Sequence, residues 1–145
     1  MNYIYTTGYE GESTDKFIQK LLKENIDIVI DIRQNPVSRK PGFSKKPLSL
    51  LLKNFKIGYL HIEELGTPTP LRDYLKKTNN YETFFEMYKS FVMEYKESIF
   101  DLVDLAKQYR ICLLCFENNV HFCHRGVIAG LIEEFSDNSV TVEHI

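Results

Sequence analysis

Short runs of apolar and β-branched residues recur along the chain, and each run is followed by polar residues, glycine or proline. The pattern predicts five strands, at 2–7 (NYIYTT), 26–32 (IDIVIDI), 57–62 (IGYLHI), 110–116 (RICLLCF) and 139–145 (SVTVEHI). The β-branched run at 26–32 is typical of a strand that is buried on both faces of a parallel sheet.

Apolar residues between these strands recur every three or four positions, which is the spacing of a helix with one buried face. A helix follows residue 12, with Ser13 or Thr14 as its cap, and another follows Ser44, which is its predicted cap. The segment 64–75 leads into a short helix. Two helices or one bent helix are expected over 81–108, and a last helix over 124–135.

Strands that alternate with helices predict an α/β fold, here a three-layer sandwich around a mainly parallel sheet of about five strands. We interpret residues 1–145 as a single domain, because no linker, repeat or low-complexity segment divides the chain. Ligands of such folds bind outside the carboxyl ends of the strands. The polar stretches TTGYEG, DIRQNPVSR, HIEELG and CFENNVHFCHRG each follow a strand, so we expect them to converge on one edge of the sheet.

The composition is that of an ordinary soluble protein, with 43% hydrophobic and 26% charged residues in a chain of 145. No apolar stretch approaches the roughly 20 residues of a membrane span, and the N-terminus lacks the pattern of a signal peptide. The cysteines at 112, 115 and 123 form an odd, clustered set rather than a disulfide framework. We therefore expect a cytoplasmic protein with reduced thiols and no membrane partner.

Charge is unevenly distributed along the chain, although the net charge is only −2. Residues 32–62 contain seven basic residues and no acidic one, so the rest of the chain carries a net charge of −9. A basic surface of this kind would bind phosphate groups or nucleic acid. The alternative is that the basic loop and the helix faces are simply solvated.

The segment CFENNVHFCHRGV (115–127) concentrates two cysteines, two histidines, a glutamate and an arginine, and it allows three interpretations. A metal site is the first, because zinc would accept Cys115, His121, Cys123 and His124 as ligands. The spacing differs from that of the usual structural zinc sites. The adjacent Cys123 and His124 are also poorly placed to share one ion.

A reactive thiol is the second interpretation. Cys123 lies just before a predicted helix, and the helix dipole and the neighbouring His124 and Arg125 would favour its thiolate. Cys115, at the end of a strand, is the competing thiol. The alternative is that both cysteines fill space beside packed strands.

Acid–base groups are expected near Cys115, namely Glu117 and His61, which lies near the end of another strand. His61 is either a general base or a structural histidine whose hydrogen bonds are satisfied. Cys112 lies inside the most apolar strand, and its expected role is packing.

Anion binding is the third interpretation. The helix that opens near His124 has first-turn amides without intrahelical partners, and Arg125 adds a bidentate donor beside them. Arg33, Arg39 and Lys40, on the loop after the second strand, would face the same crevice. Phosphate, sulfate or a carboxylate would suit such a site.

Asp31 ends an apolar strand, where a lone carboxylate is unfavourable unless it is paired or hydrogen-bonded. In one interpretation it caps loop amides or pairs with an arginine such as Arg125. In the other it is an acid–base group or orients a histidine. Both place Asp31 at the edge of the site, where Gly8 would serve a tight turn or a close approach of the backbone.

The motifs TTGYEG, DIRQNPVSRKPGFSK, YLHIEELG and LLCFE followed by CHRGVIAGLI resemble, in this order, the family called domain of unknown function 488. The resemblance covers nearly the whole chain, and it implies a compact α/β domain of prokaryotic, cytoplasmic type without supplying an activity. It also implies that the following signature residues cluster: Asp31, Arg33, Pro36, Ser38, Gly42, Phe43, Cys115, Glu117, Cys123, His124 and Arg125.

A fainter similarity to rhodanese-like domains rests on the motif DIR after an early strand and on a cysteine-to-arginine loop that opens a late helix. Those domains place about four or five residues between the cysteine and the arginine. Cys115 and Cys123 both differ from that spacing relative to Arg125. Sulfur or phosphoryl transfer is therefore not carried over from the similarity.

The leading hypothesis is an enzyme-like site for an anionic small molecule or nucleotide, acting as a transferase or hydrolase on a phosphorylated or nucleotide-like substrate. The predicted catalytic residues are Cys115, Glu117, Cys123, His124 and Asp31. The predicted anion-binding residues are Arg33, Ser38, Arg39, Arg125, Gly8, Tyr9 and His61. The sequence requires no metal or cofactor. The alternatives are a non-catalytic nucleic-acid-binding module that uses the basic segment 33–56, and a structural zinc site.

Overall fold

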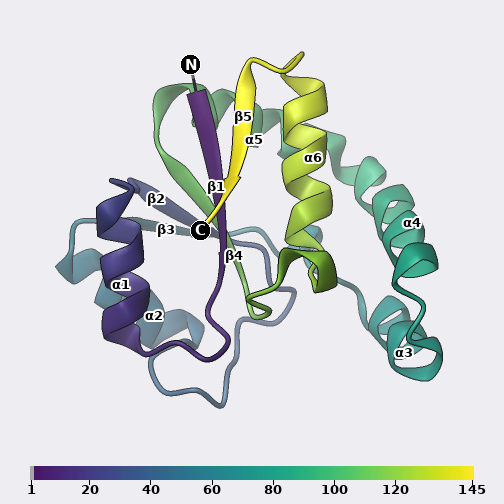
Figure 1. Ribbon diagram of the computed structural model, residues 1–145, viewed down its shortest axis with the longest axis horizontal. Coiled ribbons are helices and arrows are strands. Elements are labelled where there is room, and N and C mark those ends of the chain that lie inside the picture. Colours follow the sequence, from purple (N-terminus) through teal and green to yellow (C-terminus); the bar gives the residue numbers. More distant parts are fainter. Residues whose placement is uncertain (1) are drawn as a thin grey trace.

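Five parallel strands form the centre of the protein in a computed structural model that describes residues 2–145 (Figure 1). They are β1 (Asn2–Gly8), β2 (Ile28–Asp31), β3 (Gly58–His61), β4 (Ile111–Cys115) and β5 (Val140–His144). Their spatial order is β3-β2-β4-β1-β5, and all neighbouring pairs are parallel. The predicted α/β fold with a sheet of about five strands is confirmed.

Helices cover both faces of the sheet. Helices α1 (Thr14–Lys23) and α2 (Lys45–Asn54) lie on one face, and α5 (Lys96–Gln108) and α6 (Arg125–Phe135) lie on the other (Figure 1). Helices α3 (Thr69–Thr78) and α4 (Tyr81–Val92) follow β3. Short 3-10 helices complete the connections: η1 (Glu63–Leu65), η2 (Met93–Tyr95) and η3 (Val120–Phe122). Because η2 separates α4 from α5, the segment 81–108 forms two helices.

Serine side chains fix two of the connections. The Ser13 hydroxyl accepts a hydrogen bond from the Lys16 amide at 3.1 Å, which confirms Ser13 as the cap of α1. Ser44 occupies the cap position of α2, but its hydroxyl accepts from the Ser38 amide and donates to the Ser38 carbonyl, at 3.0 and 3.2 Å. Ser44 therefore holds the loop after β2 together, and the prediction of a side-chain cap for α2 is wrong.

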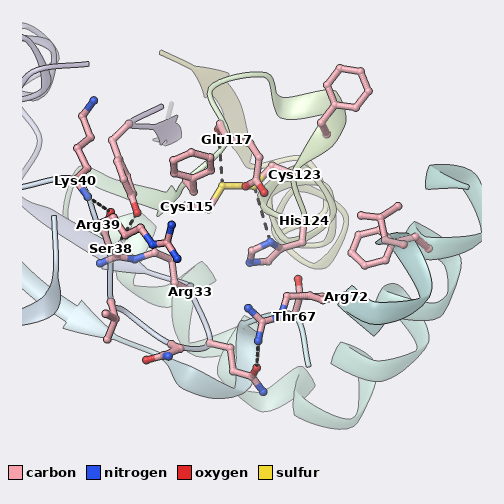
Figure 2. A pocket seen from close by; sticks show the side chains of 18 residues that line it. Arg33, Ser38, Arg39, Lys40, Thr67, Arg72, Cys115, Glu117, Cys123 and His124 are labelled. Carbon is pink, nitrogen blue, oxygen red and sulfur yellow. Dashed lines mark hydrogen bonds between the residues drawn. A yellow bond between two sulfur atoms is a disulfide. The ribbon is translucent and has the colours of Figure 1, made fainter. Parts of the chain in front are cut away.

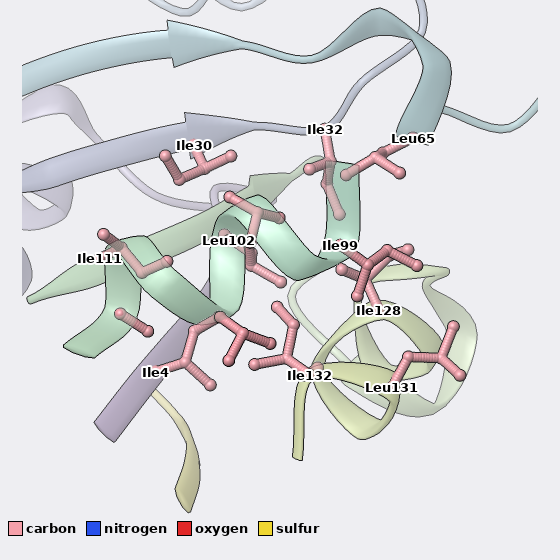
Figure 3. Close-up of a cluster of buried hydrophobic side chains, with 14 of the residues drawn as sticks. Ile4, Ile30, Ile32, Leu65, Ile99, Leu102, Ile111, Ile128, Leu131 and Ile132 are labelled. Atoms are coloured by element: carbon pink, nitrogen blue, oxygen red, sulfur yellow. The ribbon is translucent and has the colours of Figure 1, made fainter. Parts of the chain in front are cut away.

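The sheet is buried on both faces, which explains why the sequence of β4, ICLLC, is apolar throughout. Ile111 belongs to the hydrophobic cluster that α5 and α6 cover (Figure 3), and Leu113 belongs to the same cluster. Cys112 and Leu114 alternate with them and belong to the second cluster, under α1 and α2. Burial of each large apolar side chain stabilises the fold by about 1.5–3 kcal/mol.

The register of the sheet brings the carboxyl ends of four strands to one edge. Gly8 pairs with Cys115, and Asp31 pairs with His61, and each of these residues is the last of its strand. The predicted convergence of the polar stretches at this edge is therefore confirmed. Within residues 2–145, no helix is both long and apolar enough to span a bilayer.

Candidate functional site

A cavity of about 460 Å³ opens at the carboxyl edge of the sheet (Figure 2). Its walls come from the loops after β1, β2 and β4, and from α3 and α4. The predicted site residues that line it are Tyr9, Arg33, Ser38, Arg39, Cys115, Glu117, Cys123 and His124. The predicted site residues that do not line it are Asp31, Arg125, Gly8 and His61.

Asp31 and Arg33 form an ion pair behind the cavity wall, with 0% and 7% of their surfaces exposed. Arg33 Nε and Nη2 donate to the two Asp31 carboxylate oxygens at 2.9 and 2.7 Å, and the Arg33 amide donates to the same carboxylate at 3.1 Å. The Tyr59 hydroxyl donates a further hydrogen bond to Asp31. Asp31 thus pairs with an arginine, as one interpretation predicted, but the partner is Arg33 and not Arg125.

The remaining donors of Arg33 are also engaged. Arg33 Nη1 donates to the Tyr9 hydroxyl at 3.0 Å and to the Phe43 carbonyl at 2.7 Å. His61 Nε2 donates to the Arg33 carbonyl at 2.7 Å, so His61 supports this loop from β3. Burial alone would lower the pKa of Arg33, but the hydrogen bond and the charge of Asp31 raise it above its ordinary value. Because Asp31 balances its charge, Arg33 adds little net charge to the cavity.

Arg125 is buried, with 1% of its surface exposed, and it holds the loop after β4. Its Nη1 donates to the Glu117 carbonyl, its Nη2 donates to the Asn118 carbonyl at 2.9 Å, and its Nε donates to the Thr6 hydroxyl at 3.2 Å. Gly8 leaves room for this loop, because a Cβ atom at Gly8 would lie 1.8 Å from the Glu117 carbonyl oxygen. Arg125 and Gly8 therefore position the cavity wall without facing the cavity.

The sulfur atoms of Cys115 and Cys123 are joined in a disulfide that lines the cavity between Glu117 and His124 (Figure 2). The expectation of reduced thiols is therefore wrong for this pair. Cys112 is the free cysteine, and burial raises its pKa to about 12. Its position in the core agrees with the packing role predicted for it.

His124 precedes α6 and is buried beside Cys123. His124 Nε2 lies 2.8 Å from the Ile32 carbonyl oxygen, and since a carbonyl can only accept, we assign the ring proton to Nε2. Nδ1 then presents its lone pair to Cys123 Sγ at 3.8 Å. Burial lowers the pKa of His124 to about 4, so its imidazole is neutral at neutral pH.

The first amides of α6 have partners within the chain. Gly126 donates to the Cys123 carbonyl at 3.4 Å, and Val127 and Ile128 donate to the His124 carbonyl at 3.0 and 3.3 Å. The expectation of free amides at the start of this helix is therefore wrong. The start of α6 therefore offers no unpaired amide at these three positions for an anion in the cavity.

Three basic side chains line the cavity without a carboxylate partner among residues 2–145, namely Arg39, Lys40 and Arg72. Arg39 and Lys40 come from the loop after β2, and Arg72 comes from α3 (Figure 2). Arg72 Nη2 donates to the side chains of Gln34 and Thr69 at 3.2 and 3.3 Å. Arg72 was not predicted as a site residue. Its one signal in the sequence is a cation near the start of a helix, where positive charge is unfavourable.

Glu117 is the acidic side chain of the cavity lining. Burial raises the pKa of its carboxyl group above the ordinary value. The aromatic rings of Phe116 and Phe122 also line the cavity, with 44% and 49% of their surfaces exposed. The cavity therefore offers cations, a carboxyl group that keeps its proton to a higher pH than usual, and exposed aromatic faces.

Cys115, Glu117 and Cys123 place one sulfur or oxygen atom each within 4.8 Å of one another. Because the two sulfur atoms are bonded to each other, the carboxylate is the one free donor of this group, and a zinc ion needs more. His121 is exposed and stands outside the group. The described residues therefore do not bring together the zinc ligands proposed from the sequence.

Comparison with protein families shows a match between residues 13–132 and the family described as Domain of unknown function DUF488. The matched region includes all the predicted site residues except Gly8 and Tyr9. Comparisons with curated proteins and with solved structures find no match.

Proposed function

We propose that this chain, which belongs to the DUF488 family, binds a small phosphorylated or nucleotide-like anion in the cavity at the carboxyl edge of its sheet. The observation that carries the proposal is the set of three cations, Arg39, Lys40 and Arg72, that line the cavity without a carboxylate partner among residues 2–145. Ammonium and guanidinium groups in a concave site attract phosphate oxygens and form charge-assisted hydrogen bonds with them.

The charge balance of the cavity supports an anionic ligand. Asp31 neutralises Arg33, so the cavity lining contains three unpaired cations and one acidic side chain, Glu117. The raised pKa of Glu117 further reduces the negative charge as the pH falls. The volume of about 460 Å³ lies within the range of small-molecule sites, which is roughly 300–1,000 Å³.

The aromatic residues at the cavity favour a ligand that carries a base. The rings of Phe116 and Phe122 are about half exposed, and an aromatic side chain in this position can stack on a nucleobase. A ligand with a phosphate group near the cations and a nucleobase stacked on an aromatic ring would be nucleotide-like.

Proton transfer in the cavity would involve Glu117. Burial raises the pKa of its carboxyl group, which suits it to donate a proton to a leaving oxygen, whereas His124, with a pKa of about 4, is neutral and would act as a hydrogen-bonding group. Asp31 is fully buried, and its carboxylate accepts hydrogen bonds from Arg33. We therefore assign Asp31 the role of positioning Arg33 and not a role in proton transfer. The chemistry that fits these groups is transfer or hydrolysis of a phosphorylated substrate.

Titration calorimetry with pyrophosphate and with ADP tests the proposal. The wild-type protein should bind both, and the double variant Lys40→Gln/Arg72→Gln should bind at least about tenfold more weakly, because each charge-assisted hydrogen bond contributes about 1.5–3 kcal/mol. Lys46→Gln is the matched control, since Lys46 is exposed on α2 and does not line the cavity. Failure of the wild type to bind either anion, or equal affinities of the two variants, would refute the proposal.

Binding of nucleic acid through the basic segment 33–56 is a second candidate function. The lysines of α2 and its end are exposed and have no carboxylate partner in the described part of the chain: Lys45, Lys46, Lys53 and Lys56. The affinity for RNA or DNA would then fall steeply with salt, because neutralised phosphates release counterions. Affinity that is independent of salt, or unchanged in Lys46→Gln/Lys53→Gln, would contradict this candidate.

A further inference from the structure

We infer that the Cys115–Cys123 disulfide is a redox pair that exchanges with a low-molecular-weight thiol carrying phosphate groups. The inference rests on the proposed anion site, because that site would hold the phosphate of the thiol. The disulfide lines the same cavity as the free cations Arg39, Lys40 and Arg72. Cys115 and Cys123 are buried, with 0% and 3% of their surfaces exposed, but both border the cavity, so a thiolate bound there would approach the disulfide from the Cys123 side.

The surroundings of the two sulfur atoms favour exchange. Arg125 Nη1 lies 3.2 Å from Cys115 Sγ, and its positive charge stabilises a thiolate at that position. Cys123 Sγ faces His124 Nδ1 at 3.8 Å. Because His124 Nε2 donates to the Ile32 carbonyl, Nδ1 is free to accept a hydrogen bond from the Cys123 thiol once the disulfide is reduced.

The third cysteine differs from the pair in its surroundings. Cys112 is as buried as Cys115, but it lies in the cluster under α1 and α2 and does not line the cavity. Burial raises the pKa of its thiol to about 12, so it stays protonated and unreactive. Cys112 therefore serves as an internal reference for every measurement on Cys115 and Cys123.

The exchange proceeds in two steps, in which RSH denotes the phosphorylated thiol. A thiolate RS⁻ attacks Cys123 Sγ, a bond forms between this sulfur and RS, and the Cys115–Cys123 bond breaks. Its electron pair remains on Cys115 as a thiolate beside Arg125, which makes Cys115 the better leaving group. A second RS⁻ then attacks the bound RS sulfur, which forms RSSR and releases Cys123. Two RSH are oxidised, the protein gains two electrons, and the two protons of RSH pass to the cysteines.

The phosphate group of the thiol is inferred from the cavity itself. The basic side chains that are free to bind a ligand lie in the same cavity as the disulfide, so an anionic thiol would be concentrated there, whereas a neutral thiol would not. Phe116 and Phe122 would accommodate a nucleotide attached to that thiol. Pantetheine, 4′-phosphopantetheine and coenzyme A form a matched series of probes, because they share one thiol arm and differ in phosphate and nucleotide.

Redox titration of the wild-type protein is the first test. The protein is equilibrated with mixtures of coenzyme A and its disulfide, the free thiols are alkylated, and the products are resolved by mass spectrometry. Cys115 and Cys123 should lose or gain their alkyl groups together, while Cys112 remains reduced in every mixture. Independent titration of the two residues, or two thiols that stay reduced in excess coenzyme A disulfide, would overturn the inference.

Trapping of the intermediate tests the assigned direction of attack. Incubated with coenzyme A disulfide, Cys115→Ser should accumulate a mixed disulfide between Cys123 and coenzyme A, because Cys115, which displaces coenzyme A when the exchange runs in reverse, is missing. Cys115→Ala provides the same test if the serine variant does not fold. An adduct that forms on Cys115 in Cys123→Ser, with none on Cys123 in Cys115→Ser, would show that the assignment is wrong.

The rates of disulfide reduction test the class of thiol. Coenzyme A and 4′-phosphopantetheine should reduce the wild-type disulfide about tenfold or more faster than pantetheine does. Lys40→Gln/Arg72→Gln should remove most of this difference by slowing coenzyme A and 4′-phosphopantetheine, and Lys46→Gln should preserve it. Equal rates with all three thiols in the wild type would overturn the assignment of a phosphorylated thiol.

Pyrophosphate binding to Cys115→Ser/Cys123→Ser separates this inference from the proposed function. If the cysteine-free site binds pyrophosphate with wild-type affinity while the wild-type disulfide resists all thiols, the redox inference fails and the anion site stands. If pyrophosphate does not bind to any form of the protein, the anion site fails, and with it the assigned thiol class.

Discussion

Replacement of Asp31 by asparagine tests the ion pair that holds the wall of the cavity. Asp31 is 0% exposed and accepts hydrogen bonds from Arg33 Nε, Arg33 Nη2 and the Arg33 amide at 2.7–3.1 Å, and from the Tyr59 hydroxyl. Asparagine has almost the same shape, but it carries no negative charge. It also replaces one of the two accepting oxygen atoms by an NH₂ group, which is itself a donor. The Arg33 guanidinium would then be buried without a counter-charge. Removal of one partner of a buried ion pair costs about 3–5 kcal/mol.

This loss is large compared with the stability of a small protein, which is typically about 5–15 kcal/mol. Urea unfolding at pH 7, followed by circular dichroism, should therefore show a markedly lower midpoint for Asp31→Asn at an unchanged slope. Asp101→Asn is the matched control, because Asp101 is exposed on α5 and has no ion pair within residues 2–145. Its stability should change by less than about 0.5 kcal/mol.

A double variant separates the pair from other effects of the mutation. In Asp31→Asn/Arg33→Gln no uncompensated charge remains, so the combined loss should be smaller than the sum of the two single losses by about 0.5–3 kcal/mol. If Asp31→Asn cost less than about 1 kcal/mol, or if the two single losses were additive, the ion pair would not be the support of the cavity wall.

Three further predictions concern the loop after β4 and its neighbours. Gly8→Ala should destabilise the protein by about 1–3 kcal/mol in urea unfolding, because the new Cβ would meet the Glu117 carbonyl oxygen at 1.8 Å. Gly130→Ala, in open space on α6, should be neutral or stabilising, and equal effects would contradict the close approach. Burial raises the pKa of Glu117 above its ordinary value. The affinity for sulfate should rise as the pH falls through this pKa, because protonation removes a negative charge from the cavity. Calorimetry of Glu117→Gln should show no such rise. In the folded protein the pKa of His124 is about 4, whereas in the unfolded chain it has the ordinary value of 6.5. The free energy of unfolding should therefore fall by about 3 kcal/mol more in the wild type than in His124→Gln between pH 7 and pH 4, and parallel pH profiles would contradict this.

The strands and their common edge could be predicted from the sequence, because both follow from local patterns. Apolar runs such as ICLLC are required wherever a strand is covered on both faces, and β4 is covered in this way. Once the strands are parallel, their carboxyl ends meet at one edge, whatever the details of packing. Gly8, Asp31, His61 and Cys115 lie at this edge, as expected, for this reason.

The partners of the two central arginines could not be predicted in the same way. Arg33 follows the end of β2 and Arg125 begins α6, and either one would satisfy Asp31 by charge alone. The choice depends on where the loop of Glu117 and Asn118 passes, since this loop supplies the carbonyl groups that hold Arg125. Nothing in the local sequence fixes the path of that loop, because the space beside Gly8 and the reach of the arginine from α6 decide it.

The disulfide and Arg72 were missed because they depend on how the connections fold back. Cys115 and Cys123 are eight residues apart, and the loop between them includes η3, which returns the chain to the end of β4. Arg72 reaches the cavity because α3 is placed beside the loop after β2, where Gln34 orients its guanidinium. Periodicity indicates that a helix exists, but it does not indicate which distant loop the helix faces.

The most direct test of the anion site is a crystal structure of the protein soaked in tungstate, which mimics phosphate and scatters X-rays strongly. We predict one anion in the cavity, within about 3 Å of a side-chain nitrogen of Arg39, Lys40 or Arg72. An empty cavity in crystals that bind tungstate elsewhere, or an anion seated only on the lysines of α2, would contradict the account.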